Sequence, residues 1–235
     1  MHRPIPSLSV LIPNFNHGHL IGDQLRAILS QSLQPEKIVI VDDASTDNSV
    51  EIIRELISGQ TSVELICKSE NSGVVALVNE FVLRTTSDYV TVLAADDIVL
   101  PGLFEQSLEL LREHPEAAIC SAVSYTESGT GAYVTPGPSA YPTNVPEYLN
   151  PPRVLGLLTR REDWFMGDTI ILRREALLAE GLFDPALLSY ADGFMYRVLA
   201  LRYGACFIPR ILAINRVFGT GYSSSTTRDE KSFNH

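Results

Sequence analysis

The hydrophobic pattern of the first hundred residues alternates between short apolar runs and longer segments with helical spacing. Apolar runs that predict buried strands lie at residues 8–12, 38–41, 63–67 and 89–93. Between these runs, apolar residues recur every three or four positions, as they do in amphipathic helices. The second of these helices is expected to start at Thr46 or Asp47 as its N-cap. A β-α-β-α-β-α-β order with right-handed crossovers predicts a parallel sheet covered by helices on both faces.

The remainder of the chain is less regular. Helices are predicted at residues 102–113, 154–159, 174–180 and 192–203, and strands at 117–124, 168–172, 205–208 and 211–215. Residues 125–152 are rich in glycine and proline, and a long loop of this kind is typical of a functional or mobile segment. The tail after Gly219 is predicted to be mobile. No internal repeat or linker divides the chain, so we predict one domain over residues 1–235.

Composition and charge limit the classes of function. The chain has 235 residues, of which 45% are hydrophobic and 20% charged, as in ordinary globular proteins. Its formal charge of −10 and the lack of a large basic patch argue against nucleic-acid binding. No apolar run approaches the ~18 residues of a membrane span, and the N-terminus has no apolar segment that would predict a signal peptide. Peripheral association with a membrane is compatible with this sequence.

Three cysteines, Cys67, Cys120 and Cys206, each lie in a strand-like run. Their spacing matches neither a zinc site nor a disulfide framework. An odd number of such residues favours reduced, buried thiols, which are typical of a cytoplasmic protein.

Two adjacent acids, Asp96 and Asp97, follow the apolar run at residues 89–93. In open α/β sheets, ligands bind beyond the carboxyl ends of the strands. Neighbouring carboxylates repel each other unless a cation lies between them, and a divalent metal bound to phosphates would serve. The alternative is that one of the acids caps the helix that follows Pro101. The pair alone leaves both interpretations open.

Polar groups also follow the first strand at Pro13–Asn16 and the second strand at Asp42-Asp43, so three strand ends are expected to meet in one crevice. The motifs along the chain are Ser9–Asn16, Val41–Asp47, Asn71–Gly73 with Asn79, Leu93–Asp97 with Pro101, and Gly181–Asp184, followed by Asp192, Arg197 and Arg216. Their order and spacing over about 200 residues resemble the inverting, GT-A-fold glycosyltransferases of the large family 2.

The resemblance implies a Rossmann-like, mostly parallel α/β sheet with a C-terminal acceptor-side subregion. Residues 1–100 would be the nucleotide-binding half, 101–218 the acceptor-side half and 219–235 the tail. It also implies metal-dependent transfer of a sugar from a UDP- or dTDP-type donor to a hydroxyl of a glycan or lipid-linked acceptor. The commonest setting in the family is the synthesis of bacterial surface polysaccharide.

The resemblance further implies roles for individual residues. Asp96 and Asp97 would hold Mg²⁺ or Mn²⁺ and face the donor. Phe15 and Asp43, with Pro13 and Asp42, would hold the nucleobase by stacking and an imide hydrogen bond. Asn71 and Gly73 would complete the nucleotide-sugar site. Residues 125–152 and the tail would shape the acceptor side.

Asp192 matches the position of the family's general base, which takes the proton of the acceptor hydroxyl. The alternative is an ordinary N-cap, because an acid that opens a helix commonly has that role. Trp164, the only tryptophan, is open to two interpretations as well: a stacking surface for an acceptor sugar, or a core residue.

Three positions depart from the family's pattern. Ala94 and Ala191 stand where many members have acids, and Phe218 stands where many have a histidine that adds a metal ligand. Fewer protein ligands predict weak metal binding in the absence of nucleotide. These departures also support an alternative function, that of a catalytically degenerate nucleotide-sugar-binding relative or partner subunit. The sequence does not specify the sugar, the acceptor, the linkage or the oligomeric state.

Overall fold

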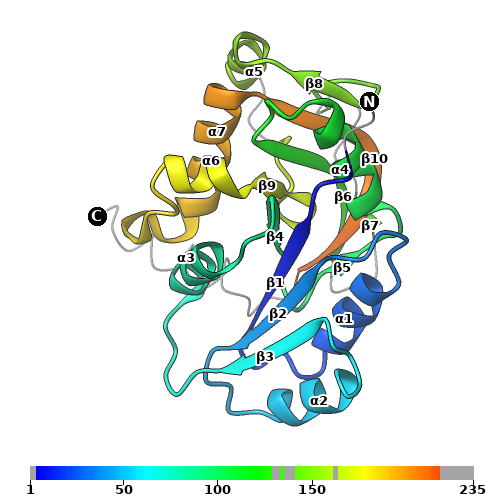
Figure 1. The fold of residues 1–235 in the computed structure, drawn as a ribbon, viewed down its shortest axis with the longest axis vertical. Coiled ribbons are helices and arrows are strands. Elements are labelled where there is room, and N and C mark those ends of the chain that lie inside the picture. The colour runs from blue at the N-terminus through cyan, green and yellow to red at the C-terminus, as the bar shows by residue number, and fades with distance from the viewer. Residues whose placement is uncertain (1–3, 129–132, 135–140, 161–163, 218–235) are drawn as a thin grey trace.

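The computed structural model describes residues 4–128, 133–134, 141–160 and 164–217. They form a sheet with the strand order β3-β2-β1-β4-β9-β6-β10-β5, to which β7 adds by pairing with β6 and β8 by pairing with β10 (Figure 1). This mostly parallel sheet, flanked by helices, confirms the predicted fold class. The predicted tail, residues 219–235, lies outside the described residues.

The first half of the chain follows the predicted order. The strands are β1 (Leu8–Asn14), β2 (Lys37–Asp42), β3 (Val63–Cys67) and β4 (Tyr89–Val92), and the helices are α1 (Ile21–Leu29), α2 (Ser49–Leu56) and α3 (Val74–Arg84). β1 pairs in parallel with β2 and β4, and β2 pairs in parallel with β3. The parallel sheet expected from the hydrophobic pattern is therefore confirmed for these four strands.

The alternation of side chains along β1 divides the core into two layers. Val10 and Ile12 pack on one face of the sheet with α1, α2 and α4 (Leu103–Glu113). Leu11 packs on the other face with α3, α5 (Pro151–Leu158), α6 (Arg174–Ala179) and α7 (Ala191–Tyr203). Figure 1 shows α1 and α2 on one side of the strands and α3 on the other. Successive strand residues point to opposite faces, so both faces must be covered.

The second half extends the sheet with strands of both directions. Its strands are β5 (Ile98–Val99), β6 (Ile119–Ser128), β7 (Tyr133–Val134), β8 (Glu147–Leu149), β9 (Ile171–Arg173) and β10 (Ala205–Val217), with 3-10 turns η2 (Gly167–Thr169) and η3 (Pro185–Tyr190). β9 runs antiparallel to β4 and β6, whereas β6 and β10 are parallel. β5 pairs antiparallel with β10.

Several predicted boundaries are wrong. The expected strands at 205–208 and 211–215 are one strand, β10, whose pairing with β6 shifts register between Ile208 and Ala213. The expected strand at 168–172 begins instead as the η2 turn. The expected loop at 125–152 contains the end of β6, the strands β7 and β8, and the start of α5. Pairing with β10 and β6 supplies the backbone hydrogen bonds that the local sequence does not signal.

Two further expectations need correction. The N-cap of α2 is Asn48, although the Asp47 carboxylate does accept a hydrogen bond from the Ser49 N–H at 3.0 Å. Cys67 is exposed, because β3 is an edge strand, whereas Cys120 and Cys206 are buried as expected. All three are free thiols. Within the described residues, no helix is both long and apolar enough to cross a membrane.

Gly204, which joins α7 to β10, gives a test of this packing. Its φ is 80°, and a Cβ there would lie 2.5 Å from the Tyr148 ring and 2.7 Å from the Leu149 carbonyl oxygen. We expect Gly204→Ala to lower the free energy of unfolding by roughly 3 kcal/mol, from backbone strain plus overpacking. Urea denaturation measures the change.

Gly59→Ala is the matched control, because Gly59 has a φ of 81° but no neighbouring atom within 4 Å of the position that a Cβ would take. It should cost roughly 1 kcal/mol, from strain alone. Equal losses in the two variants would contradict the packing at Gly204.

Candidate active site

The carboxyl ends of three neighbouring strands meet at one edge of the sheet. β2 and β4 lie on either side of β1, and the Leu93 N–H donates to the Leu11 carbonyl oxygen at 2.9 Å, just before the acid pair (Figure 1). The polar segments that follow β1, β2 and β4 are therefore neighbours, as parallel pairing requires. This arrangement brings the predicted residues Pro13–Asn16, Asp42-Asp43 and Asp96-Asp97 to one edge.

Asp42 is buried and organises the turn after β2. Its carboxylate accepts hydrogen bonds from the Asn14 side-chain amide at 2.7 Å and from the Ser45 hydroxyl at 2.6 Å. It also accepts from the Ser45 N–H at 3.0 Å, which closes the turn over Ala44. Ala44 has a φ of 65°, a conformation that is unfavourable for a residue with a Cβ. Asp42 thus joins β1 to the turn, and its predicted contact with the nucleobase stays a prediction.

Asp43 is buried too, and it joins the turn after β2 to the loop before α3. Its carboxylate accepts from the Ser72 N–H at 3.0 Å, the Ser72 hydroxyl at 2.9 Å and the Gly73 N–H at 3.0 Å. The Asn71 side chain adds a hydrogen bond to the same Gly73 N–H at 3.2 Å. A carboxylate offers about four acceptor positions, so Asp43 has acceptor capacity left for a ligand.

Phe15 lies beside this network and is 45% exposed. Pro13, two residues earlier, is half-buried at the end of β1. Phe15 follows the buried Asn14 and precedes Asn16, whose φ is 57°. The ring is available for stacking, as the sequence predicted, but no contact in the structure tests that role.

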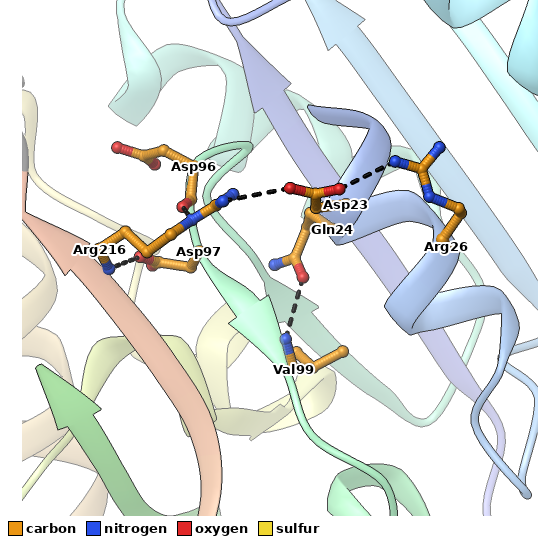
Figure 2. Close-up of polar contacts among 7 residues, drawn as sticks. All are labelled: Asp23, Gln24, Arg26, Asp96, Asp97, Val99 and Arg216. Carbon is orange, nitrogen blue, oxygen red and sulfur yellow. Dashed lines mark hydrogen bonds and ion pairs between the residues drawn. The ribbon is translucent and has the colours of Figure 1, made fainter. Parts of the chain in front are cut away.

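The loop that carries Asp96 and Asp97 is held from α1. The buried Gln24 side chain donates to the Ala94 carbonyl oxygen at 3.2 Å and accepts from the Val99 N–H at 3.0 Å. One glutamine therefore spans both ends of the loop, as Figure 2 shows for the bond to Val99. β5 then pairs with β10, which places Asn215 and Arg216 next to Asp97.

Arg216 lies between the acid loop and α1 (Figure 2). Its side chain donates to the Asp96 carbonyl oxygen and to the Asp23 carboxylate at 3.3 Å, and its backbone N–H donates to the Asp97 carboxylate at 3.1 Å. Figure 2 shows the Asp96 carboxylate directed away from this guanidinium. Arg216 is thus a clamp that holds the loop at the Asp96 carbonyl oxygen and the Asp97 carboxylate, while the carboxylate of the half-buried Asp96 points away from it.

Asp97 differs from Asp96 in its surroundings. It is 6% exposed, and its carboxylate accepts from the Asn215 side chain at 3.2 Å as well as from Arg216. Burial, together with the nearby carboxylates of Asp168 and Asp96, raises the pKa of Asp97 to about 8. The alternative of a helix cap is wrong for both acids, because α4 begins after Gly102 without a side-chain cap.

Asp192 lies in the first turn of α7, which begins one residue earlier than predicted. The N-cap is Tyr190, and Asp192 accepts a hydrogen bond only from the next residue's N–H, at 2.6 Å, among the bonds described for it. The capping interpretation of Asp192 is therefore wrong. Burial raises the pKa of Tyr196, and Asp192 and Asp168 both raise it further. Asp192 and Asp168 thus both lie near enough to Tyr196 to influence its pKa.

The residues present could hold a divalent cation only together with the phosphate oxygens of a bound ligand. The described part of the chain contains no group of three or more His, Cys, Asp or Glu side chains that could hold a metal ion. Two carboxylates, Asp96 and Asp97, remain, together with an excess of negative charge from Asp168 that a cation would offset. Mg²⁺ is commonly held by one or two carboxylates plus phosphate oxygens and water. Phe218 stands where many family members have a histidine that adds a metal ligand, and it lies outside the described residues.

Two other features lie away from this site. Trp164 is 1% exposed and stacks on Phe165 with 3.9 Å between ring centres, so the core interpretation is confirmed. A cavity of about 360 Å³ lies between α3 and the face of β2 and β3, where Val39, Ile66 and Phe81 contribute to its lining. None of the predicted site residues lines this cavity.

The fold and the site define a GT-A-like glycosyltransferase. The model of glycosyl transferase family 2 matches residues 9–178, and the protein belongs to that family. The Escherichia coli glycosyltransferase YibD, described as uncharacterized, is 29% identical over 210 residues, covering 83% of this chain and 58% of its own.

Two solved structures share the fold. S. aureus TarS in complex with UDP-GlcNAc has a TM-score of 0.75 at 18% identity, over 93% of this chain and 61% of that one. The mannosyltransferase PcManGT from Pyrobaculum calidifontis, in complex with GDP-Man and Mn²⁺, has a TM-score of 0.69 at 20% identity, over 98% and 62%. The chain thus spans about three fifths of PcManGT and of the TarS fragment 1–349, and 37% of the longer TarS structure.

Sequence reasoning missed several residues that build the site. Gln24 and Asn215 are amides that hold its loops, and Asp168 is a buried acid expected only as part of a strand. Buried amides carry no distinctive spacing in the sequence. For Asp168 a signal was available, because the Gly167-Asp168-Thr169 triplet interrupts an apolar stretch at a turn.

The raised pKa of Asp97 predicts a specific dependence of stability on pH. The folded-state value of about 8 exceeds the ordinary value of about 3.9. The stabilising contribution is therefore complete below pH 4 and is lost as the pH rises through 8. Asp97→Asn removes this loss, so we expect it to gain roughly 3 kcal/mol over wild type between pH 5 and 8.

Urea denaturation in EDTA at several pH values measures this difference. The exposed acid Glu109 on α4 provides the charge control, and Glu109→Gln should follow wild type across the range. A constant difference between Asp97→Asn and wild type would contradict the effect of burial on the pKa of Asp97.

Proposed function

We propose that the protein transfers a sugar from a UDP- or dTDP-type donor to a hydroxyl of a glycan or lipid-linked acceptor. Mg²⁺ or Mn²⁺ on the donor diphosphate, and an acceptor in surface polysaccharide synthesis, belong to the proposal. The observation that carries it is the meeting of Phe15, Asp43 and Asp96-Asp97 at the ends of three adjacent strands. The Phe15 ring would stack on the base, and the Asp43 carboxylate would accept a hydrogen bond from it. Asp96 and Asp97 would hold the cation on the diphosphate.

The nucleobase half of the site favours a base with an imide N–H. Phe15 offers an exposed ring, and the Asp43 carboxylate keeps acceptor capacity after its three hydrogen bonds. Uracil and thymine present such a donor, and adenine does not. The relative TarS binds UDP-GlcNAc, which supports this choice, whereas PcManGT binds GDP-Man and makes guanine the competitor to test.

The diphosphate half of the site would have to bind a negatively charged group in a protein whose formal charge is −10. Asp96 and Asp97 would bind the divalent cation, which neutralises charge that develops on the leaving diphosphate. The buried Arg216 side chain has one nitrogen, Nη2, without a partner among the described residues. That nitrogen would donate to a diphosphate oxygen, and the bonds of Arg216 to Asp23 and to the Asp96 carbonyl would orient it.

The transfer step needs a base on the acceptor side. The acceptor hydroxyl oxygen forms a bond to the anomeric carbon while the bond from that carbon to the diphosphate oxygen breaks. The hydroxyl proton passes to the Asp192 carboxylate, and the nucleoside diphosphate leaves with the electron pair. Asp192 is exposed in the first turn of α7, where an acceptor has access to it. Attack from the face opposite the leaving group inverts the anomeric centre.

Nucleotide binding tests the donor assignment directly. A ligand that binds only the folded state raises the melting temperature. We expect UDP or dTDP to raise it with Mn²⁺ or Mg²⁺ present, GDP to raise it less, and ADP to leave it unchanged. Thermal unfolding with and without EDTA measures these shifts. The absence of a shift with any of the four nucleotides would contradict the proposal and favour a degenerate relative.

The role of Asp192 is tested by separating binding from transfer. We expect Asp192→Asn to reduce sugar transfer, or donor hydrolysis, by about 10²–10⁴-fold, the contribution typical of a general base. The shift in melting temperature with nucleotide and metal should remain that of wild type. Glu175→Gln is the control, since Glu175 is another acid in a helix first turn, that of α6. An Asp192→Asn variant with wild-type turnover would exclude Asp192 as the base.

A further inference from the structure

Asp168 is a buried acid that no step of the proposed reaction uses. It lies in the η2 turn, which contacts β5, β6 and β10. Asp97 directly precedes β5 and accepts hydrogen bonds from β10. It is 7% exposed, and the Ser124 hydroxyl on β6 donates a hydrogen bond to its carboxylate. Its second carboxylate oxygen, Oδ2, is buried without a hydrogen-bond partner among the described residues.

The fold fixes this carboxylate in place. The Thr169 hydroxyl accepts from the Ala122 N–H at 2.9 Å and donates to the Met166 carbonyl oxygen at 2.8 Å. On the other side, the Thr91 hydroxyl donates to the Ile170 carbonyl oxygen at 2.7 Å. Buried hydroxyls therefore tie the turn to β6 and to β4. Asp168 is held on a rigid scaffold, and its position beside the acid loop is set by the sheet.

Such a carboxylate is costly unless something positive or hydrogen-bonding meets it. An unpartnered buried carboxylate loses its hydration without compensation. Burial raises the pKa of Asp168 to about 6, and the charge of Asp168 contributes more to the raised pKa of Asp97 than the adjacent Asp96 does. No described lysine, arginine or histidine forms an ion pair with Asp168. Within the described residues, the charged form of Asp168 therefore has no cationic partner.

A second buried atom at the same site lacks a partner, and it has the opposite polarity. Arg216 Nη2 is a donor without an acceptor, while Asp168 Oδ2 is an acceptor without a donor. Both residues lie near Asp97, which contacts Arg216 directly. A ligand that carries both anionic oxygens and donor groups, such as a diphosphate with a hydrated cation, would satisfy both atoms.

We propose that Asp168 is an outer carboxylate of the cation site, accepting hydrogen bonds from water bound to the cation that Asp96 and Asp97 hold with the donor diphosphate. This inference rests on the proposed function. Direct ligation is not part of it, because Asp96, Asp97 and Asp168 do not form a group that could hold a metal ion by themselves. Mg²⁺ usually retains several waters in proteins, and a carboxylate outside the first ligand shell can accept hydrogen bonds from these waters. Asp168 would supply the negative charge that is missing at Ala94, where many family members have an acid.

The binding of Mn²⁺ in the presence of saturating UDP tests the inference. The electron paramagnetic resonance signal of free Mn²⁺ gives its affinity without any need for turnover. We expect Asp168→Asn to weaken Mn²⁺ affinity 10–100-fold, the usual effect of removing an outer-shell partner. UDP binding in EDTA should be unchanged. Asparagine has nearly the same shape and carries no charge, so the fold should persist.

Two more variants make the result specific. Glu180→Gln is the matched control, because the Glu180 side chain is 8% exposed but is paired with Arg202 and Tyr203 away from the site. It should keep wild-type Mn²⁺ affinity. Ser124→Ala removes the hydroxyl that orients Asp168, so it should weaken Mn²⁺ binding by less than Asp168→Asn does. This variant keeps the inference testable if Asp168→Asn does not fold.

The outcomes separate this inference from the proposed function. Wild-type protein that binds Mn²⁺ with UDP, and an Asp168→Asn variant of equal affinity, would overturn the role of Asp168 alone. Wild-type protein that binds no Mn²⁺ with UDP would overturn both the role of Asp168 and the UDP–metal part of the proposed function. Equal losses in Asp168→Asn and Glu180→Gln would show a general effect on folding and would also overturn the inference.

Discussion

The site depends on the burial of two acids, Asp97 and Asp168, near the half-buried Asp96. Burial raises the pKa of Asp97 and of Asp168, and repulsion by the Asp168 and Asp96 carboxylates raises the pKa of Asp97 further. The fold opposes this repulsion mainly with neutral donors: Asn215, the Arg216 backbone N–H and the Ser124 hydroxyl. It adds one guanidinium, which donates to the Asp96 carbonyl oxygen. Without a cation, burial therefore favours the protonated acids, and a divalent cation would favour their ionised forms.

Gln24 and Arg216 show why this repulsion does not open the loop. Gln24 joins both ends of the loop to α1, and Arg216 joins its middle to β10 and, through Asp23, again to α1. The helix and the strand come from opposite ends of the chain, so the loop is clamped by long-range contacts. Groups fixed in this way lose little entropy when a ligand binds, and their geometry does not need to reorganise.

The sequence allows the first half of the fold to be predicted, because its strands and helices are signalled locally. Period-two and period-3.6 patterns decide the elements from β1 to β4, and a parallel order follows from the crossovers. The acid pair and Asp43 are found in the same way, at strand ends. The second half is different. β5 is two residues long, β8 three, and β10 is irregular, so pairing partners and not local propensity define these strands. Asn215 and Asp168 belong to this half, and their places near Asp97 follow from pairings that no single segment encodes.

Asp42 and Asp43 are adjacent, and each carboxylate accepts three hydrogen bonds, but the two residues join different parts of the site. Asp42 binds the Asn14 side chain and the turn at Ser45, which places Ala44 at positive φ. Asp43 binds the Ser72–Gly73 loop and so joins the end of β2 to the start of α3. A pair of acids at a strand end should accordingly be interpreted as two separate residues, and the same argument separates the half-buried Asp96 from the buried Asp97.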